Sequence, residues 1–281
     1  MIIAGIIVAI LLIYHIYPFT VTEKLPYHLG SVNYYNNIPL VIYRSYDKRY
    51  TNKKMYDSCH KKWIDMNPMC KDVWYTPVQC KSFLKDFDTR VYNAYNKLKP
   101  IAFKSDLWRL CILYKYGGIY ADCYTTPYKT IKVMLERFSG DNTFISVLDG
   151  DKKGIHNGFI IATKQHPFLL RCIENIVENV EANNYTDHVL GVTGPLCLAK
   201  SVRDVLSKNL NTNRKFKVGW NRYGNLSFYL FEFEWGPFQY IKKDGQVIMS
   251  KKYSLLHYFY SKILKRSLTY NSMWERRDIY N

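Results

Sequence analysis

The chain has 281 residues, 48% of them hydrophobic, and carries 40 Lys and Arg against 23 Asp and Glu, for a net charge of +17. This hydrophobic content supports a packed core and excludes an intrinsically disordered chain. The positive charge favours an anionic partner such as a nucleotide diphosphate, an anionic glycan or a lipid surface. Because the basic residues are scattered along the chain, we expect no dedicated nucleic-acid surface.

The first 22 residues predict a membrane anchor. They contain no Lys, Arg, Asp or Glu, and residues 2–13 are continuously apolar. A helix of about 20 residues, rising ~1.5 Å per residue, can cross a hydrocarbon layer of ~30 Å. The alternative, a cleaved signal peptide, requires a basic start and a small-residue cleavage site, whereas residues 14–19 supply aromatic side chains. We therefore predict a single-pass membrane protein with an uncleaved anchor at 1–22.

This anchor places the protein in a membrane, with the domain in a lumen of the Golgi or endoplasmic reticulum type if the cell is eukaryotic. The orientation stays open, because Lys24 is the only basic residue close to the anchor and Glu23 lies beside it. Residues 23–37 contain Pro26, Gly30 and little periodicity, which is typical of a stem or linker.

Strands and helices then alternate up to Pro100. The predicted elements are a strand at 38–46, a helix at about 53–65 that stops at Asn67-Pro68, a second strand at 73–75, and a mostly helical stretch at 79–98.

Residues 103–124 form the stretch around which the rest of the domain is organised. A helix is predicted from about Ser105 to Tyr116, and two glycines then break it before a short strand at 119–121. The strand ends on the carboxylate of Asp122. Because ligands of α/β proteins collect at the carboxyl ends of strands, this acid marks a candidate site.

Asp106 and Arg109 in the predicted helix allow two interpretations. They are three residues apart and therefore share one helix face, so both can address one ligand. In the alternative, Ser105 is the N-cap, Asp106 stabilises the first turn through the helix dipole, and Arg109 is its surface partner.

The same alternation continues after the central stretch. The predicted elements are a helical or irregular stretch at 128–138, strands at 143–148, 158–163, 228–235, 247–249 and 255–258, helices at about 167–183 and 196–206, and a basic tail at 262–281. Strands separated by helices predict one α/β domain, which we place at residues 38–281.

Other groups that could form a site have simpler explanations. None of the seven cysteines forms a C-x-x-C unit, so a structural zinc site is not expected, and Cys111 and Cys172 are predicted to be buried. Asp149-Gly-Asp151 is a D-x-D triplet, but before Lys-Lys-Gly it is more typical of a solvated turn than of a metal site. Glu232 and Glu234 could supply an acid or a base, and an exposed strand face explains them equally well.

Seven short motifs follow one another along the chain. They are Ile38-Pro39 to Tyr46, Trp63-x-x-x-Asn67-Pro68, Ser105-Asp106-Leu-x-Arg109, Leu113-Tyr-x-x-Gly-Gly-Ile-Tyr120-x-Asp122, Asn157-x-Phe159, His166-Pro167 and Gly194-Pro195. The series resembles the family 32 glycosyltransferases, the group with the DXD sugar-binding region that includes yeast mannosyltransferases. Tyr43 and Tyr46 stand where that family has His and Trp.

This resemblance implies a GT-A (Rossmann-like) nucleotide-sugar-binding fold. The implied function is retaining transfer of a hexose from a nucleotide-sugar donor to a glycan, glycolipid or glycoprotein acceptor. The implied site has Asp122 as its catalytic residue, donor-sugar contacts from Asp106, Arg109, Tyr120 and Asn157, nucleotide contacts from Ile42, Tyr43 and Tyr46, and diphosphate contacts from Tyr124, His257 and Lys262.

The chain departs from the family at the DXD triplet itself, which is Asp122-Cys123-Tyr124 and lacks the second acid. In the family that acid usually holds a divalent cation, Mn²⁺ or Mg²⁺, which stabilises the departing diphosphate. Three interpretations stay open. Asp122 binds the cation with another ligand such as His257; basic groups such as Lys262, Lys265 or Arg266 replace it; or the protein is an inactive sugar- or nucleotide-binding scaffold.

Overall fold

A computed structural model describes residues 31–47, 53–136, 138, 143–209, 215–224, 226–234, 239–251 and 269–281. The predicted anchor at 1–22 and the site candidates His257 and Lys262 lie outside these residues and stay predictions. Within the described ranges, no helix combines the length and the apolar character that crossing a membrane requires.

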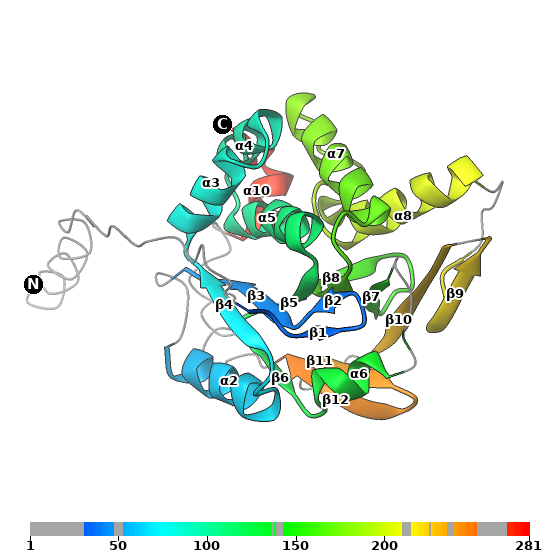
Figure 1. Ribbon diagram of the computed structural model, residues 1–281. Coiled ribbons are helices and arrows are strands. Elements are labelled where there is room, and N and C mark those ends of the chain that lie inside the picture. The colour runs from blue at the N-terminus through cyan, green and yellow to red at the C-terminus, as the bar shows by residue number, and fades with distance from the viewer. Residues whose placement is uncertain are drawn as a thin grey trace, which may run out of the picture.

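The strands of the central sheet are β3 (Val41–Ser45), β4 (Lys71–Tyr75), β5 (Gly118–Ala121), β6 (Thr125–Pro127), β7 (Phe144–Leu148), β8 (Ile155–Ala162), β9 (Gly219–Tyr223), β10 (Leu226–Glu234), β11 (Gln239–Lys243) and β12 (Gln246–Lys251). Their order is β4-β3-β5-β8-β7-β10-β11-β12-β6, and β9 pairs with β10 (Figure 1). β3 is parallel to β4 and β5, whereas β8 is antiparallel to β5 and β7. β1 (Tyr34–Tyr35), in the predicted stem, pairs with β2 (Ile38–Pro39), at the start of the predicted domain.

The helices are α2 (Lys53–Met66), α3 (Pro77–Lys85), α4 (Thr89–Lys97), α5 (Ile101–Tyr116), α6 (Ile131–Leu135), α7 (Pro167–Glu181), α8 (Pro195–Asn209) and α10 (Tyr270–Glu275). Figure 1 shows α3, α4, α5, α7, α8 and α10 over one face of the sheet, with α2, α6, β11 and β12 on the other. Each face encloses its own hydrophobic core. The mixed α/β class that the sequence predicts is confirmed.

The central helix α5 begins one turn earlier than predicted. Its N-cap is Pro100, which makes no side-chain capping bond, so the interpretation of Ser105 as N-cap is wrong. The start was missed because α5 is buried on most of its surface, and a helix without a polar face has no periodicity to mark where it begins. Its end follows the prediction, because Gly117 and Gly118 have φ of 69° and 108°, values that favour glycine.

Other predicted boundaries also shift. The helical stretch at 79–98 is two helices, because the Asp88 side chain accepts from the Val91 amide at 2.9 Å and caps α4. Strands β6, β9 and β11 and helix α10 were not predicted. β11 and β12 are joined by Asp244 and Gly245, both with positive φ, which is the turn chemistry of a tight hairpin.

The pairing of β12 with β6 is the feature of the fold that builds the site. Lys251, the last residue of β12, lies opposite Thr125, three residues after Asp122. This pairing brings the end of β12, which is far from β5 in the sequence, close to the carboxyl end of β5.

Candidate active site at the end of β5

The Asp122 carboxylate, directly after β5, is held by three groups. Its Oδ1 accepts a hydrogen bond from the Tyr120 hydroxyl at 2.9 Å and lies 3.4 Å from Arg109 Nη1. Its Oδ2 accepts one from Lys251 Nζ at 2.7 Å. A Cβ added at Gly158 would lie 2.8 Å from Oδ2, so the absence of a side chain there is what lets the carboxylate approach β8.

Arg109 connects the helix α5 to this carboxylate. It donates from Nη1 to the Asn157 carbonyl oxygen at 2.8 Å and from Nη2 to the Ser105 hydroxyl at 3.1 Å. Its Nη2 also lies 3.3 Å from Asp106 Oδ1, and its guanidinium lies over the Tyr120 ring, 4.4 Å from the centroid. The four residues predicted to contact the donor sugar therefore lie together, next to Asp122.

The alternative interpretation of Asp106 and Arg109 as a surface pair is wrong. The two residues are only 9% and 6% exposed, and Asp106 Oδ2 accepts a hydrogen bond from the Thr193 hydroxyl at 2.8 Å. Asn157 adds a polar group: its side-chain Nδ2 is buried, makes no hydrogen bond of normal geometry in the part of the chain described, and lies close enough to Asp106 to lower the pKa of that carboxyl. Such an atom is costly to bury unless a ligand satisfies it.

Burial and charge set the protonation of these groups. Burial by itself raises the pKa of Asp122, but Lys251 and Arg109 outweigh it and hold the pKa well below its usual range. Burial raises the pKa of Asp106 to about 6, although Arg109 and the Thr193 hydroxyl act in the opposite direction. Burial, with Lys251 next, lowers the pKa of His156 to about 4, so this imidazole is neutral at pH 7.

The predicted nucleotide-binding residues divide into two environments. Ile42 and Tyr43 are each 1% exposed and pack in the two cores. Tyr46, one residue past β3, is half-buried and lies 5.1 Å from the Tyr56 ring and 5.7 Å, edge to face, from Trp74. Only Tyr46 of the three therefore presents its ring at the end of the sheet.

Two basic residues of this site were missed at the sequence level, and one is Arg44. It is fully buried, pairs with Asp72 at 2.9 Å and donates to the Asp122 carbonyl oxygen at 3.3 Å. Its Nη2 has no partner among the described residues. Its position in the strand directly before Tyr46 is the one signal that could have identified it. The second missed basic residue is Lys251, which no sequence motif marks.

The remaining candidates are Tyr124, His257 and Lys262. Tyr124 is half-buried, two residues after Asp122. The other two lie outside the described residues, as do Lys265 and Arg266.

The described residues around Asp122 do not by themselves form a site for a divalent cation. Across the described ranges, no three His, Cys, Asp or Glu side chains come together as a metal site would require. The charged groups beside Asp122 are instead the cations Lys251 and Arg109. Asp149 and Asp151 accept hydrogen bonds from nearby amides of their own loop, which confirms the predicted turn.

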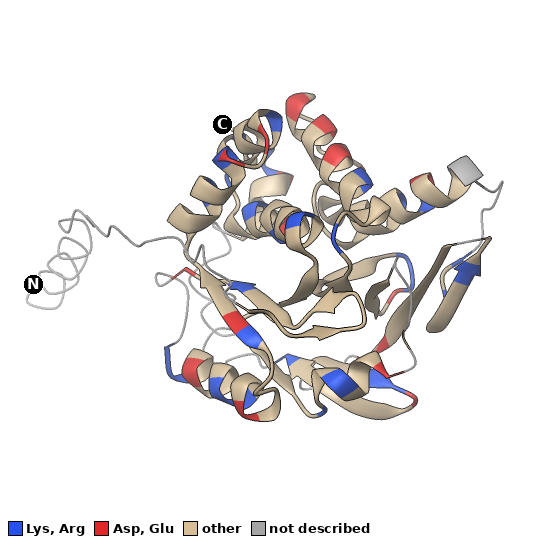
Figure 2. Ribbon diagram, viewed as in Figure 1, with Lys and Arg blue, Asp and Glu red and all other residues tan. Residues whose placement is uncertain are grey.

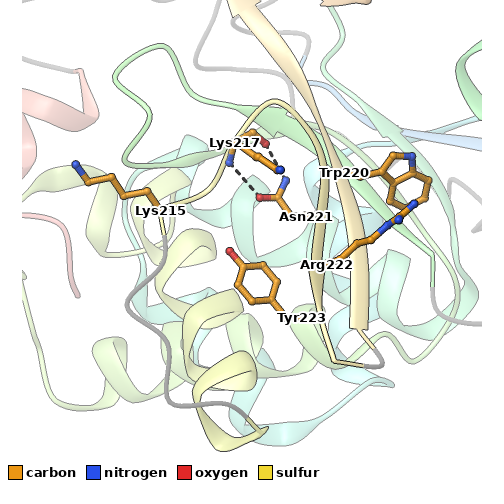
Figure 3. Close-up of a pocket in the computed structure, with 6 residues that line it drawn as sticks. All are labelled: Lys215, Lys217, Trp220, Asn221, Arg222 and Tyr223. Carbon is orange, nitrogen blue, oxygen red and sulfur yellow. Dashed lines mark hydrogen bonds between the residues drawn. The ribbon is translucent and has the colours of Figure 1, made fainter.

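A cavity of about 470 Å³ lies elsewhere, beside β9 (Figure 3). It is lined by Lys215, Lys217, Trp220, Asn221, Arg222 and Tyr223. The Asn221 amide is already bonded to the backbone of Lys217, and β10, β7 and β8 separate β9 from β5. None of the predicted site residues lines this cavity. Lys and Arg elsewhere are spread over helices and strands, as the sequence indicated (Figure 2).

Comparison with known proteins gives matches over part of the chain. Residues 43–144 match the family described as "Glycosyltransferase sugar-binding region containing DXD motif". Human alpha-1,4-N-acetylglucosaminyltransferase is 28% identical over 144 residues, which are 47% of this chain and 36% of that protein. Inositol phosphoceramide mannosyltransferase 3 of Schizosaccharomyces pombe is 28% identical over 165 residues, 58% of this chain and 44% of that protein.

The matched segments thus span less than half the length of these curated relatives. Among solved structures, PaToxG Glycosyltransferase has 18% identity and a TM-score of 0.47, over 62% of this chain and 72% of that one. The family match covers β3 to the start of β7, including α5, β5 and Asp122. Residues 43–144 therefore match the sugar-binding region of the DXD-containing glycosyltransferases, the family that the motif series resembles.

Proposed function

We propose that this protein is a glycosyltransferase of family 32 with a GT-A fold, which transfers a hexose from a nucleotide-sugar donor with retention of configuration. The observation that carries the proposal is the convergence of Asp106, Arg109, Tyr120 and Asn157 on Asp122. These side chains lie within or beside the segment that matches the family. The proposed acceptor is a glycan, a lipid or a protein-linked sugar, and the predicted anchor at 1–22 would hold the domain at a membrane.

The donor sugar is placed against Asp106 and Asn157. A carboxylate accepts hydrogen bonds from sugar hydroxyls, and the buried Asn157 amide nitrogen, which makes no hydrogen bond of normal geometry among the described residues, donates one. Arg109 orients both groups, because it contacts the Asp106 carboxylate and the Asn157 backbone. Enclosure of this kind makes each hydrogen bond stronger than it would be in water.

The nucleotide base is placed on Tyr46, in the aromatic group formed with Tyr56 and Trp74. Aromatic rings support a planar base by stacking. Ile42 and Tyr43 would contribute only by holding β3 in place, because their side chains are buried.

The proposed reaction breaks the bond between the anomeric carbon and the diphosphate oxygen. Its electron pair stays on that oxygen, while the acceptor hydroxyl forms the new bond from the same face of the sugar. The acceptor proton moves to a donor phosphate oxygen, so no protein base is required. Preorganised positive charge at the phosphates lowers the barrier, since negative charge accumulates there as the bond breaks.

A panel of nucleotide sugars, assayed by diphosphate release, tests the proposal. Asp122→Ala should reduce transfer by at least about 100-fold, because Arg109 and Lys251 lose their shared acceptor. Asp106→Ala should weaken donor use by about 10- to 100-fold through the KM, as loss of a charged hydrogen bond does. Asp151→Ala, in the exposed turn, is the matched control. Transfer at the wild-type rate in the Asp122 variant, or a wild-type KM for the donor in the Asp106 variant, would sink the assignment.

The second candidate is a binding or scaffold protein that retains the fold without catalysis, and Tyr124 in the DXD triplet motivates it. Binding of a nucleoside diphosphate without donor hydrolysis or transfer, with and without Mn²⁺, would favour this alternative. The names of the two relatives specify different sugars, N-acetylglucosamine and mannose, so the panel should contain both classes of donor.

A further inference from the structure

Lys251 forms an ion pair with the Asp122 carboxylate at the end of β5. Its Nζ lies 2.7 Å from Asp122 Oδ2, while Oδ1 is engaged by Tyr120 and Arg109. The position of Lys251 is fixed by two neighbours in the sheet, because β12 pairs with β6 on one side and β11 on the other. The contact between Lys251 and Asp122 is therefore fixed by the pairing of β12 in the sheet.

The charge at Asp122 is balanced without a metal ion. Two carboxylates and one divalent cation sum to zero. Here Tyr124 stands in place of the second carboxylate, and the Asp106 and Asp122 carboxylates with the Arg109 and Lys251 side chains also sum to zero. Lys251 thus supplies positive charge beside a triplet that lacks the second acid, and a divalent ion placed there would meet one carboxylate and two cationic side chains.

Lys251 is also accessible to a ligand. Its side chain is 23% exposed and that of Asp122 is 20% exposed, whereas the Arg109 side chain is only 7% exposed. An ammonium group carries three N–H donors and can bridge a carboxylate and a phosphate oxygen. Arg44 lies on the other side of the same residue, with Nη1 3.3 Å from the Asp122 carbonyl oxygen.

We propose that Lys251, positioned by Asp122, binds the donor diphosphate and neutralises its charge in place of the divalent cation of the DXD family. This role rests on the proposed function, since it requires a nucleotide-sugar donor at the end of β5. Lys251 acts on the ground state and on the departing diphosphate alike, because both carry negative phosphate oxygens.

The test measures binding of ADP, CDP, GDP and UDP to the full chain by calorimetry, in EDTA and again in excess Mn²⁺. The wild-type protein should bind at least one diphosphate equally well under both conditions. Lys251→Met should weaken that binding by about 10-fold or more in EDTA, because it removes a charged hydrogen bond, and Lys251→Arg should retain most of it. The corresponding nucleoside, which lacks phosphates, should bind wild type and Lys251→Met equally.

The control is Lys200→Ala, which removes a lysine that pairs with Asp204 at 2.8 Å on α8. Wild-type binding that requires Mn²⁺ would overturn the proposal, and so would Lys251→Met binding diphosphate as tightly as wild type in EDTA. Both results would leave the glycosyltransferase assignment standing. If the wild-type chain binds none of the four diphosphates and turns over no donor, the proposed function fails and this role fails with it. Thermal unfolding of each variant shows that any loss is not a loss of fold.

Discussion

Two cations contact the same carboxylate from environments that differ in burial. Arg109 reaches Asp122 from the core-facing side of α5, with a side chain that is 7% exposed and has protein acceptors around its guanidinium. Lys251 reaches it from the end of β12, with a side chain that is 23% exposed. A buried charge must be satisfied by the protein itself, whereas a partly exposed one can exchange partners with a ligand. Burial thus separates a group that holds the site together from one that can act on a substrate.

Replacing the buried cation should have the largest effect on stability. In Arg109→Met the Asp106 and Asp122 carboxylates lose a common partner and stay largely enclosed, so the free energy of unfolding should fall by about 3–5 kcal/mol. Urea denaturation measures this loss. Arg109→Lys, which keeps the charge but not the planar group of donors, should recover only part of it. A loss below about 1 kcal/mol in Arg109→Met would show that Arg109 is no more structural than a surface ion pair.

Titration of Asp106 should have the next largest effect on the free energy of unfolding. Its pKa is raised to about 6, so the native state binds more protons than the unfolded state between about pH 4 and 6. Its stabilising contribution is therefore present below about pH 4 and lost as the pH rises through 6. His156, with its pKa lowered to about 4, acts in the opposite direction over the same range.

A comparison of wild type with Asp106→Asn separates these two groups, because His156 is common to both proteins. Relative to the variant, the wild type should lose on the order of 2 kcal/mol of unfolding free energy between about pH 4 and 7. Urea denaturation at several pH values measures the difference. A difference that is independent of pH would show that the pKa of Asp106 is the same in the native and unfolded states.

The fold was predictable where local chemistry determines structure. Gly117 and Gly118 end α5 where the sequence indicated, because a side chain there would be strained by positive φ. The start of α5 was not predictable from periodicity, since the helix is buried on most of its surface. The hairpin at Asp244 and Gly245 could have been predicted from its turn sequence alone.

The site was predictable where local spacing or the family resemblance marked its residues, as the resemblance did for Asn157. Asp106, Arg109, Tyr120 and Asp122 lie within one helix–strand unit, so their spacing and the family resemblance identified them together. Lys251 is 129 residues from Asp122, and only the pairing of β12 with β6 joins them. The strand predicted at 247–249 stops two residues short of it. The cation substitutes proposed from the sequence, Lys262, Lys265 and Arg266, lie outside the described residues and stay predictions.

Replacing the exposed cation should have the smallest effect on stability, although it should have a large effect on diphosphate binding. In Lys251→Met the Asp122 carboxylate keeps its contacts with Tyr120 and Arg109, and its side chain is 20% exposed to water. The free energy of unfolding should therefore fall by about 1 kcal/mol or less at neutral pH. The depressed pKa of Asp122 should rise in this variant, because Lys251 is one of its two cationic partners.

A rise in the pKa of Asp122 changes how stability depends on pH. A depressed pKa contributes stability above the unfolded value, near 3.9, and this is lost as the pH falls through the folded pKa. Acid unfolding of Lys251→Met should therefore begin at a higher pH than that of wild type, while Lys251→Arg stays close to wild type. Circular dichroism during acid titration measures both. A large loss of stability at neutral pH would place Lys251 with Arg109 as a structural cation and remove the distinction between the two.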